Sequence, residues 1–251
     1  MNIEPYPNEP LSRQSAPQGA GVASERVADI LAARILDGTL EPGARIKQDE
    51  LADELSTSRI PVRDALRMLE SRGLVSIRTN AGARVISLTR RDLEASFDVR
   101  ERIEPLLLAD SLSNFEQADI EYLHETLLHA EAAQELGESM LRYRAYHDAS
   151  YRRHSSPFLA QIVARVWDTT HSYRLASLRR FLASEAGRSD RLAVLQPTGD
   201  EQSDKLAHGL EYRLHYEAVA RRDIEGAQAA LVLHIRRIRH RVLLACEAFV
   251  A

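Results

Sequence analysis

The chain has 251 residues, of which 28% are charged and 44% are hydrophobic, and its formal net charge is −4. These values are typical of a globular protein that folds in water, and no run approaches the roughly 18 apolar residues of a membrane-spanning helix. The N-terminal residues lack the basic start and apolar core of a secretory signal. The single cysteine, Cys246, excludes an internal disulfide. We therefore expect a cytoplasmic protein with no membrane partner.

The first part of the chain predicts an arm followed by two helices. Residues 1–21 are rich in proline and polar side chains, which predicts a disordered arm. Residues 23–37 carry apolar side chains at helical spacing, and Gly38 follows as a helix stop. After a loop, residues 48–55 repeat that spacing over a shorter length. We expect both segments to form amphipathic helices.

The most informative segment is STSRIPVRDALRMLESRGLV, at residues 56–75. It predicts a helix with Ser58 as its N-cap, in which Arg59, Arg63 and Arg67 follow one another at intervals of four residues. At about 100° per residue these arginines form one basic stripe, and the apolar residues form a second stripe about 110° away. One side of the helix is therefore suited to packing and the other side to binding anions.

A basic hairpin follows the arginine helix. Residues 75–88 predict two short strands around a glycine-containing turn, with Arg78 and Arg84 near its tip. Residues 56–90 contain seven arginines and two acidic side chains, which gives a local net charge of +5 in an acidic chain. A winged helix-turn-helix places such a helix in a DNA groove and holds the flanking phosphates nearby. We expect residues 22–88 to form this DNA-binding domain.

The rest of the chain, residues 89–251, predicts an all-helical bundle. Glycine and proline are scarce there, the apolar spacing is helical almost throughout, and no strand-like alternation occurs. Helices are predicted at 90–113, 116–135, 138–154, 157–186, 201–221 and 223–249. Pro105 is expected to kink or break the first helix, and residues 187–202 are expected to form a loop. The predicted fold is mainly α, with a winged helix-turn-helix domain before the bundle.

Both halves of the chain resemble a known family. LADELSTSRIPVRDALRMLESRGLV, with the LEPGARI loop before it and NAGARV after it, resembles the DNA-binding domain of the GntR family of bacterial transcription regulators. The helical half resembles the ligand-sensing FCD domain of the FadR subgroup, through FDVRERIEP (97–105), YHDASYRRHSSPFL (146–159) and RRDIEGAQAALVLHI (221–235). The resemblance implies a homodimer that binds pseudo-palindromic operator DNA, with repression as the commoner outcome in the family.

The resemblance also implies a set of DNA-contacting residues. Arg59 and Arg63 would reach base edges or phosphates, because arginine bound to guanine is the commonest specific contact. Ser58 and Arg67 would support these contacts. The alternative for Arg67 and Arg72 is that they lie on a solvated helix face and do not contact DNA. Asp49 on the preceding helix stands where some relatives carry arginine, so no base contact is expected there. The DNA-binding residues expected from the helix and the wing are Ser58, Arg59, Arg63, Arg67, Asn80, Gly82 and Arg84.

Many sensor domains of this subgroup hold a divalent metal through one aspartate and three histidines, a donor set that suits Zn, Ni or Mn. His147 and His234 fit two of those positions in this chain. Tyr143 and Tyr212 stand at the other two positions. Neutral tyrosine is a poor ligand for these ions, because the phenol ionises only near pH 10. Two of the four expected metal ligands are therefore missing.

Two interpretations of the sensor pocket follow from this substitution. In the first, His171 or His215 completes a divalent metal site with His147 and His234. In the second, which we favour, no metal or other cofactor is bound. The two histidines and the two phenols then hydrogen-bond a small effector directly.

Other residues of the sensor domain are candidates for contact with that effector. Arg100 fits a position where the family often carries an arginine facing the pocket, and its planar fork suits a carboxylate. The alternative for Arg100 is an exposed ion pair with Glu104 at i+4. Trp167, Tyr173 and Arg174 are candidate pocket walls, with core packing as the alternative for Trp167. The expected effector-binding residues are Arg100, Tyr143, His147, Tyr212 and His234.

The sequence disfavours two other classes of function. An enzyme is disfavoured because the chain has no glycine-rich phosphate loop and no nucleophile elbow, while His124 and His129 are five residues apart and cannot share a helix face as a zinc-protease pair does. Cys246 lies among apolar residues, where an inert thiol is the default. An effector-blind DNA-binding dimer is disfavoured because residues 89–251 far exceed what dimerisation needs. We predict an effector-responsive homodimeric transcription regulator.

Overall fold

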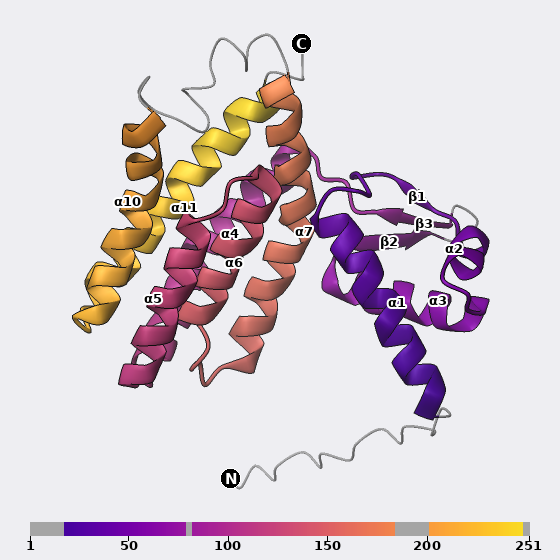
Figure 1. Cartoon of the computed structure of the whole chain (residues 1–251), viewed down its shortest axis with the longest axis horizontal. Coiled ribbons are helices and arrows are strands. Elements are labelled where there is room, and N and C mark those ends of the chain that lie inside the picture. The colour runs from indigo at the N-terminus through magenta and orange to yellow at the C-terminus, as the bar shows by residue number, and fades with distance from the viewer. Residues whose placement is uncertain (1–17, 79–81, 184–200, 248–251) are drawn as a thin grey trace, which may run out of the picture.

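A computed structural model gives the fold of the chain and describes residues 18–78, 82–183 and 201–247 (Figure 1). The described residues are mainly helical, as predicted, and carry one small sheet. The helices are α1 (Gln18–Leu36), α2 (Gln48–Glu54), α3 (Arg59–Arg72), α4 (Arg90–Leu112), α5 (Gln117–Glu131), α6 (Leu136–Ser150), α7 (Pro157–Ala183), α10 (Glu201–Ala220) and α11 (Ile224–Glu247). The strands are β1 (Arg45–Ile46), β2 (Val75–Arg78) and β3 (Gly82–Val85).

The N-terminal half packs α1, α2, α3 and the sheet around one hydrophobic core. Helix α1 begins at Gln18, within the arm expected from the sequence, and the expected loop at 187–202 falls largely outside the described residues. The sheet has the antiparallel order β1-β3-β2, so the predicted hairpin gains a third strand. Strand β1 was not predicted, because two residues are too short to show the alternation that marks a strand.

Helix α3 has the two-sided character that its sequence predicts. Val62, Leu66 and Leu69 are completely buried in the N-terminal core. The helix ends at Gly73, whose φ of +79° is a left-handed conformation that glycine adopts without a steric penalty. Ser58 is the N-cap residue, but its hydroxyl makes no capping hydrogen bond. That hydroxyl is therefore not used by the helix itself.

The C-terminal half is a bundle in which α4 packs on α11 and α7, α5 on α6, and α10 on α11 (Figure 1). Its core contains large buried side chains such as Phe97, Leu123 and Tyr146. No strand occurs within residues 90–183 and 201–247, as the spacing predicts. Helix α4 runs from Arg90 to Leu112 through Pro105, so the helix is not broken there. Within the described ranges, no helix is both long and apolar enough to cross a membrane.

Helix α7 connects the two halves, because it contacts both α1 and α3 as well as the bundle (Figure 1). The contact with α3 is close at Gly73, where a Cβ atom would lie 2.2 Å from Thr169 Oγ1 on α7. Gly43 has nearly the same backbone, with a φ of +80°, but the nearest atom to a Cβ there is 4.0 Å away. A comparison of alanine substitutions at the two glycines therefore separates the effect of backbone strain from that of crowding at the junction.

We predict that Gly43→Ala and Gly73→Ala both lower the free energy of unfolding by about 1–2 kcal/mol, because alanine is strained at positive φ. Gly73→Ala should lose about 1–3 kcal/mol more, because its methyl group meets Thr169. Adding Thr169→Ala to Gly73→Ala should recover the additional loss but not the loss caused by backbone strain. Urea unfolding measures the free energy of unfolding of the wild type, the two glycine variants and this double variant. An equal loss of unfolding free energy in both glycine variants would show that Thr169 of α7 does not crowd residue 73.

Candidate functional site

The basic stripe of α3 lies on the exposed side of the helix. Arg59, Arg63 and Arg67 are all exposed. Arg59 Nε lies 2.5 Å from Asp49 Oδ1 on α2, and more than half of each side chain is exposed. An exposed pair of this kind contributes about 0–1 kcal/mol, so a DNA phosphate or base can replace the carboxylate. Asp49 thus orients the Arg59 guanidinium, which remains available to bind DNA.

The wing adds a second basic surface. Arg84 is exposed on β3, and its Nη1 donates to the Gly43 carbonyl oxygen at 3.0 Å. Arg45 on β1 pairs directly with Arg84 in the sheet, so the two side chains are cross-strand neighbours. The sequence alone did not single out Arg45, because only strand pairing brings it to the wing. Gly82 begins β3 and is exposed, whereas the expected contact residue Asn80 lies outside the described residues.

The expected effector-binding residues come together inside the bundle, although they lie on four helices. Each of them is at most 8% exposed. The ring centroid of His147 lies 5.3 Å from that of His234 and 5.6 Å from that of Tyr212. The buried members of this polar cluster that were expected from the sequence are Arg100, Tyr143, His147, Tyr212 and His234.

Hydrogen bonds occupy both ring nitrogens of His234. Its Nδ1 lies 3.2 Å from Glu211 Oε2, and its Nε2 lies 3.0 Å from the Tyr212 hydroxyl. Since a carboxylate only accepts, Nδ1 carries the proton and Nε2 accepts from the phenol. Arg237 completes the group by donating to Glu211 Oε1 at 2.8 Å. Sequence reasoning missed Glu211, because its contact with His234 spans two helices.

The tyrosines at the expected ligand positions remain phenols. Tyr143 stacks on Tyr212 with ring centroids 4.0 Å apart. Burial raises the pKa of Tyr143 to about 12 and holds the pKa of Tyr212 well above its usual value. Among the described residues, no group of three or more histidine, cysteine, aspartate or glutamate side chains could hold a metal ion. The cluster therefore does not fit the family's metal, because two of its four ligand positions hold neutral phenols.

Arg100 pairs with Glu104, as one of the two interpretations expected, but the pair is buried rather than exposed. Arg100 Nε donates to Glu104 Oε1 at 2.5 Å, and the side chains are 2% and 0% exposed. Glu104 also accepts from Trp167 Nε1 at 3.1 Å and from the Tyr151 hydroxyl at 2.8 Å. Helical packing against α7 buries this side of α4, which a sequence pattern of i and i+4 charges does not reveal.

Trp167 lies between two arginines. The Arg100 guanidinium carbon is 3.9 Å from the indole centroid, and the Arg174 guanidinium carbon is 4.8 Å from it. The ring of His147 is 5.1 Å from the same indole. Burial, and then the charge of Arg100, lower the pKa of Arg174 to about 9, so it is still a cation at neutral pH.

Several buried polar atoms of this cluster have no hydrogen-bond partner within the described part of the chain. They are Arg100 Nη1, Arg174 Nε, His215 Nε2 and both ring nitrogens of His147. A buried polar group without a partner costs about 1–3 kcal/mol, and such groups are rare in folded proteins. Those of Arg100, Arg174 and His147 belong to side chains that lie around the Trp167 indole, which indicates a place where a polar ligand binds.

The two substitute histidines lie in different surroundings. His215 Nδ1 is 2.7 Å from the Tyr146 hydroxyl, so His215 belongs to the buried polar cluster. His171 Nε2 instead hydrogen-bonds the Leu36 carbonyl oxygen at the end of α1, at 3.1 Å. His171 therefore contributes to the junction between the two halves of the protein.

Asp168 follows Trp167 on α7 and contacts the DNA-binding half. Its carboxylate accepts from Arg72 of α3 at 3.0 Å and from Arg144 of α6 at 2.5 Å. Arg165 of α7 donates to the Ser71 carbonyl oxygen, also on α3. Consecutive residues of α7 thus contact the buried polar cluster and the end of the arginine helix.

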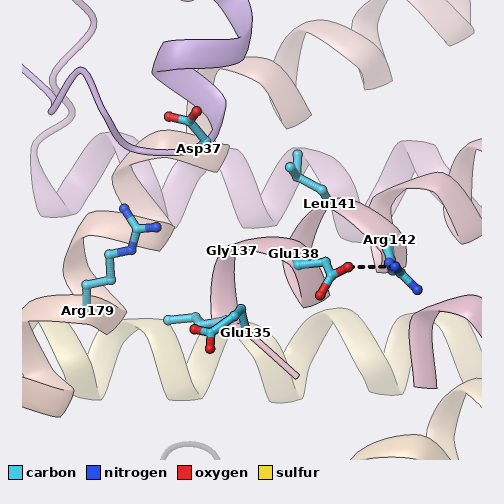
Figure 2. Close-up of a pocket in the computed structure, with 8 residues that line it drawn as sticks. Asp37, Glu135, Gly137, Glu138, Leu141, Arg142 and Arg179 are labelled. Carbon is cyan, nitrogen blue, oxygen red and sulfur yellow. Dashed lines mark hydrogen bonds and ion pairs between the residues drawn. The ribbon is translucent and has the colours of Figure 1, made fainter. Parts of the chain in front are cut away.

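A hollow of about 710 Å³ lies beside this junction. Figure 2 shows Asp37 from the end of α1, Arg179 from α7, and Glu135 and Glu138 from the start of α6 around it. Glu138 pairs with Arg142 of its own helix at 2.6 Å. The hollow is thus lined by the end of α1, the start of α6 and Arg179 of α7.

The helix-turn-helix with its basic stripe and wing, joined to a helical bundle, defines a DNA-binding transcription regulator. Residues 23–85 match the family model described as bacterial regulatory proteins of the gntR family, and residues 95–237 match the FCD domain. The chain belongs to the GntR family and carries an FCD domain as its helical half. These matches indicate a regulator rather than an enzyme, and the family domain implies operator DNA as its partner.

Individual relatives agree with this assignment. The transcriptional regulator YdhC of Bacillus subtilis is 26% identical over 80% of this chain and 82% of its own length. The gluconate operon transcriptional repressor of Bacillus licheniformis is 39% identical over 38% of this chain and 36% of its own length. The structure of Escherichia coli McbR/YncC covers 90% of this chain and 98% of its own, with a TM-score of 0.71 and 23% identity. At that identity the likeness in structure shows the fold alone.

The buried histidines predict a loss of stability in acid. Burial lowers the pKa of His171 and of His215 to about 3, whereas the unfolded value is about 6.5. The unfolded chain thus binds more protons below pH 6.5, so their contribution is complete above that pH and is lost as the pH falls toward 3. Each histidine should contribute about 1.4 kcal/mol per pH unit to the slope. Urea unfolding between pH 7.5 and 5 measures this slope.

His171→Asn and His215→Asn should each reduce the slope by about one proton. The exposed His129→Asn is the matched control and should leave the slope unchanged. Slopes that stay at the wild-type value in both buried variants would contradict the assignment of neutral, buried imidazoles.

Proposed function

We propose that this GntR-family regulator is a homodimer whose operator binding is controlled by a small acidic effector held in the buried polar cluster without a metal ion. The observation that carries the proposal is the group of buried polar atoms around Trp167 that have no hydrogen-bond partner among the described residues, including donors of Arg100 and Arg174. An anion that accepts from them would recover the hydrogen bonds that are missing. An effector-blind dimer would have no reason to keep these groups buried in its core.

DNA recognition is assigned to the exposed face of α3 and to the wing. Arg59 and Arg63 are exposed near the start of the helix, where a recognition helix meets base edges. Arg67, Ser58 and Arg84 would bind backbone phosphates beside them, with Arg45 as an added contact. A dimer with two-fold symmetry presents two such helices, which favours a pseudo-palindromic operator.

Repression is the proposed sign of regulation. The relative from Bacillus licheniformis is named a repressor, and its similarity to this chain extends over 95 residues. A repressor leaves its operator when the effector weakens the fit of the dimer to DNA. The buried polar cluster and the junction on α7 supply a physical route for such a change.

That route runs along α7. The guanidiniums of Arg100 and Arg174 both lie over the ring of Trp167. The next residue, Asp168, accepts a hydrogen bond from Arg72 at the end of α3. An effector that draws Arg100 or Arg174 toward itself would shift Trp167, and with it the adjoining carboxylate. The hollow beside Arg179 leaves room for the end of α1 to follow.

We predict that Arg59→Ala and Arg63→Ala each weaken specific operator binding by about tenfold to more than 100-fold, because each removes a fork of charged donors. Operator duplexes are obtained by in vitro selection, and binding is measured by fluorescence anisotropy. The unfolding free energy should stay within about 0.5 kcal/mol of wild type, since both side chains are exposed. Arg221→Ala, exposed at the end of α10, is the control. Retained operator affinity in both α3 variants would refute the assignment.

We further predict that Asp168→Asn separates effector binding from operator release, because a neutral amide cannot hold two guanidiniums. Small carboxylic acids are screened by thermal shift with and without EDTA, and a binder is then tested for its effect on operator affinity. The variant should bind acid and operator as wild type does, but the acid should no longer change operator affinity. Asp98→Asn is the control, because Asp98 also contacts two arginines, which lie on α4 and α11 rather than on the DNA-binding half.

Three outcomes of this screen would count against parts of the proposal. Stabilisation by acids that disappears in EDTA would overturn the metal-free pocket. A panel in which no acid stabilises the protein would overturn the effector site. Full regulation by the acid in Asp168→Asn would overturn the route along α7.

A further inference from the structure

The buried polar cluster has one more positive charge than negative charges. Arg100 and Arg174 both lie over the indole of Trp167, and Glu104 is the carboxylate beside them. Both oxygens of Glu104 face donors, and its ion-pair partner is Arg100. Arg174 is 4% exposed and has no ion pair among the described residues. One guanidinium of the cluster therefore has no counterion in the part of the chain that the structure describes.

The charges that surround the cluster are already matched with one another. Asp168 and Asp148 lie against Arg144, and Asp168 also binds Arg72. Glu211 accepts from Arg237 on the other side of the cluster. None of these carboxylates is free to neutralise Arg174, so the surplus of one positive charge belongs to the cluster itself.

The histidines add hydrogen-bonding groups to the cluster. Both ring nitrogens of His147, and Nε2 of His215, are buried and have no hydrogen-bond partner among the described residues. The ring centroid of His147 lies 5.1 Å from that of the Trp167 indole, over which Arg174 also lies. A ligand beside this indole therefore meets imidazole nitrogens as well as the guanidinium of Arg174.

We propose that the effector is a monoanion, a small monocarboxylate, and that Arg174 is the residue that holds its carboxylate. This inference rests on the proposed effector site and names the charge class of its ligand. A single carboxylate would match the one free guanidinium, while the unpartnered Nη1 of Arg100 and the nitrogens of His147 bind polar atoms next to it. The indole of Trp167 supplies an apolar surface for the body of the ligand.

Ligands of other charge fit the cluster less well. A dicarboxylate would bring a second negative charge into the core, and a buried charge without a partner is costly. An uncharged amide of the same shape would leave Arg174 unneutralised. The cluster should therefore bind a ligand with one negative charge more tightly than an uncharged ligand or a ligand with two negative charges.

The test compares probes that share a skeleton and carry one, two or no carboxylate groups. Lactate, malate and lactamide form one set, and benzoate, terephthalate and benzamide form another, within a wider panel of matched small acids. Binding to the full-length protein is measured by calorimetry at pH 7.5 with EDTA. In each set that binds, the affinity for the monocarboxylate should be at least about tenfold higher than the affinity for the dicarboxylate or the amide.

Two substitutions change the charge of the cluster in opposite directions. Arg174→Gln should weaken monocarboxylate binding by about tenfold to 100-fold and remove the preference over the amide. Without ligand this variant should unfold at a temperature no lower than wild type, because it removes an uncompensated buried charge. Glu104→Gln should instead leave two free guanidiniums, and its preference should change to the dicarboxylate. Arg221→Gln on the surface is the control and should leave all affinities unchanged.

The possible outcomes distinguish this inference from the proposed function. Dicarboxylates that bind wild type more tightly than monocarboxylates would overturn the inference but leave an acidic effector in place. Unchanged monocarboxylate affinity in Arg174→Gln would overturn the role of Arg174. If no acid in the panel binds, both the effector site and its charge class are wrong. Should one variant fail to fold, the opposite change predicted for the other variant still decides the question.

Discussion

The contact of α7 with both halves of the protein is the constraint on which the rest of the structure depends. Trp167 packs against buried arginines of the bundle, and the next residue, Asp168, binds Arg72 at the end of the DNA-binding helix. Adjacent residues of a helix are joined by a rigid backbone, so they cannot move independently. A change in the bundle around Trp167 is therefore felt where α3 ends, and Gly73 allows the two helices to approach closely there.

The same packing explains why the bundle contains charged groups that it does not neutralise. Glu104 is fully buried and holds Arg100, Trp167 and Tyr151 together, and no other described carboxylate pairs with Arg174. Such an arrangement costs stability in the free protein. Sites that bind ligands commonly carry this kind of cost, because groups that the fold leaves unsatisfied are available to a partner.

Much of the fold followed from the sequence because periodic burial dominates helix formation. The arginine and apolar stripes of α3 and the long helices of the bundle were predictable, since each is a local pattern of side chains. Strand β1 was not, because Arg45 and Ile46 form a strand only by pairing with β3. Pro105 was expected to kink or break its helix, and α4 is not broken there but continues through it while packed against α11. Local patterns thus predicted the elements but not the ways in which packing modifies them.

The sequence by itself determined the class of protein and the face of α3 that carries the basic residues, and it named the residues that meet inside the bundle. It also placed phenols where relatives have metal ligands, which favours a pocket of different chemistry. Only the tertiary structure decided which charges remain unmatched. The burial of the Arg100–Glu104 pair, the lack of an ion-pair partner for Arg174 among the described residues and the link from Asp168 to Arg72 all depend on the packing of different helices. Charge balance is a property of neighbours in space, and residue spacing along the chain does not specify those neighbours.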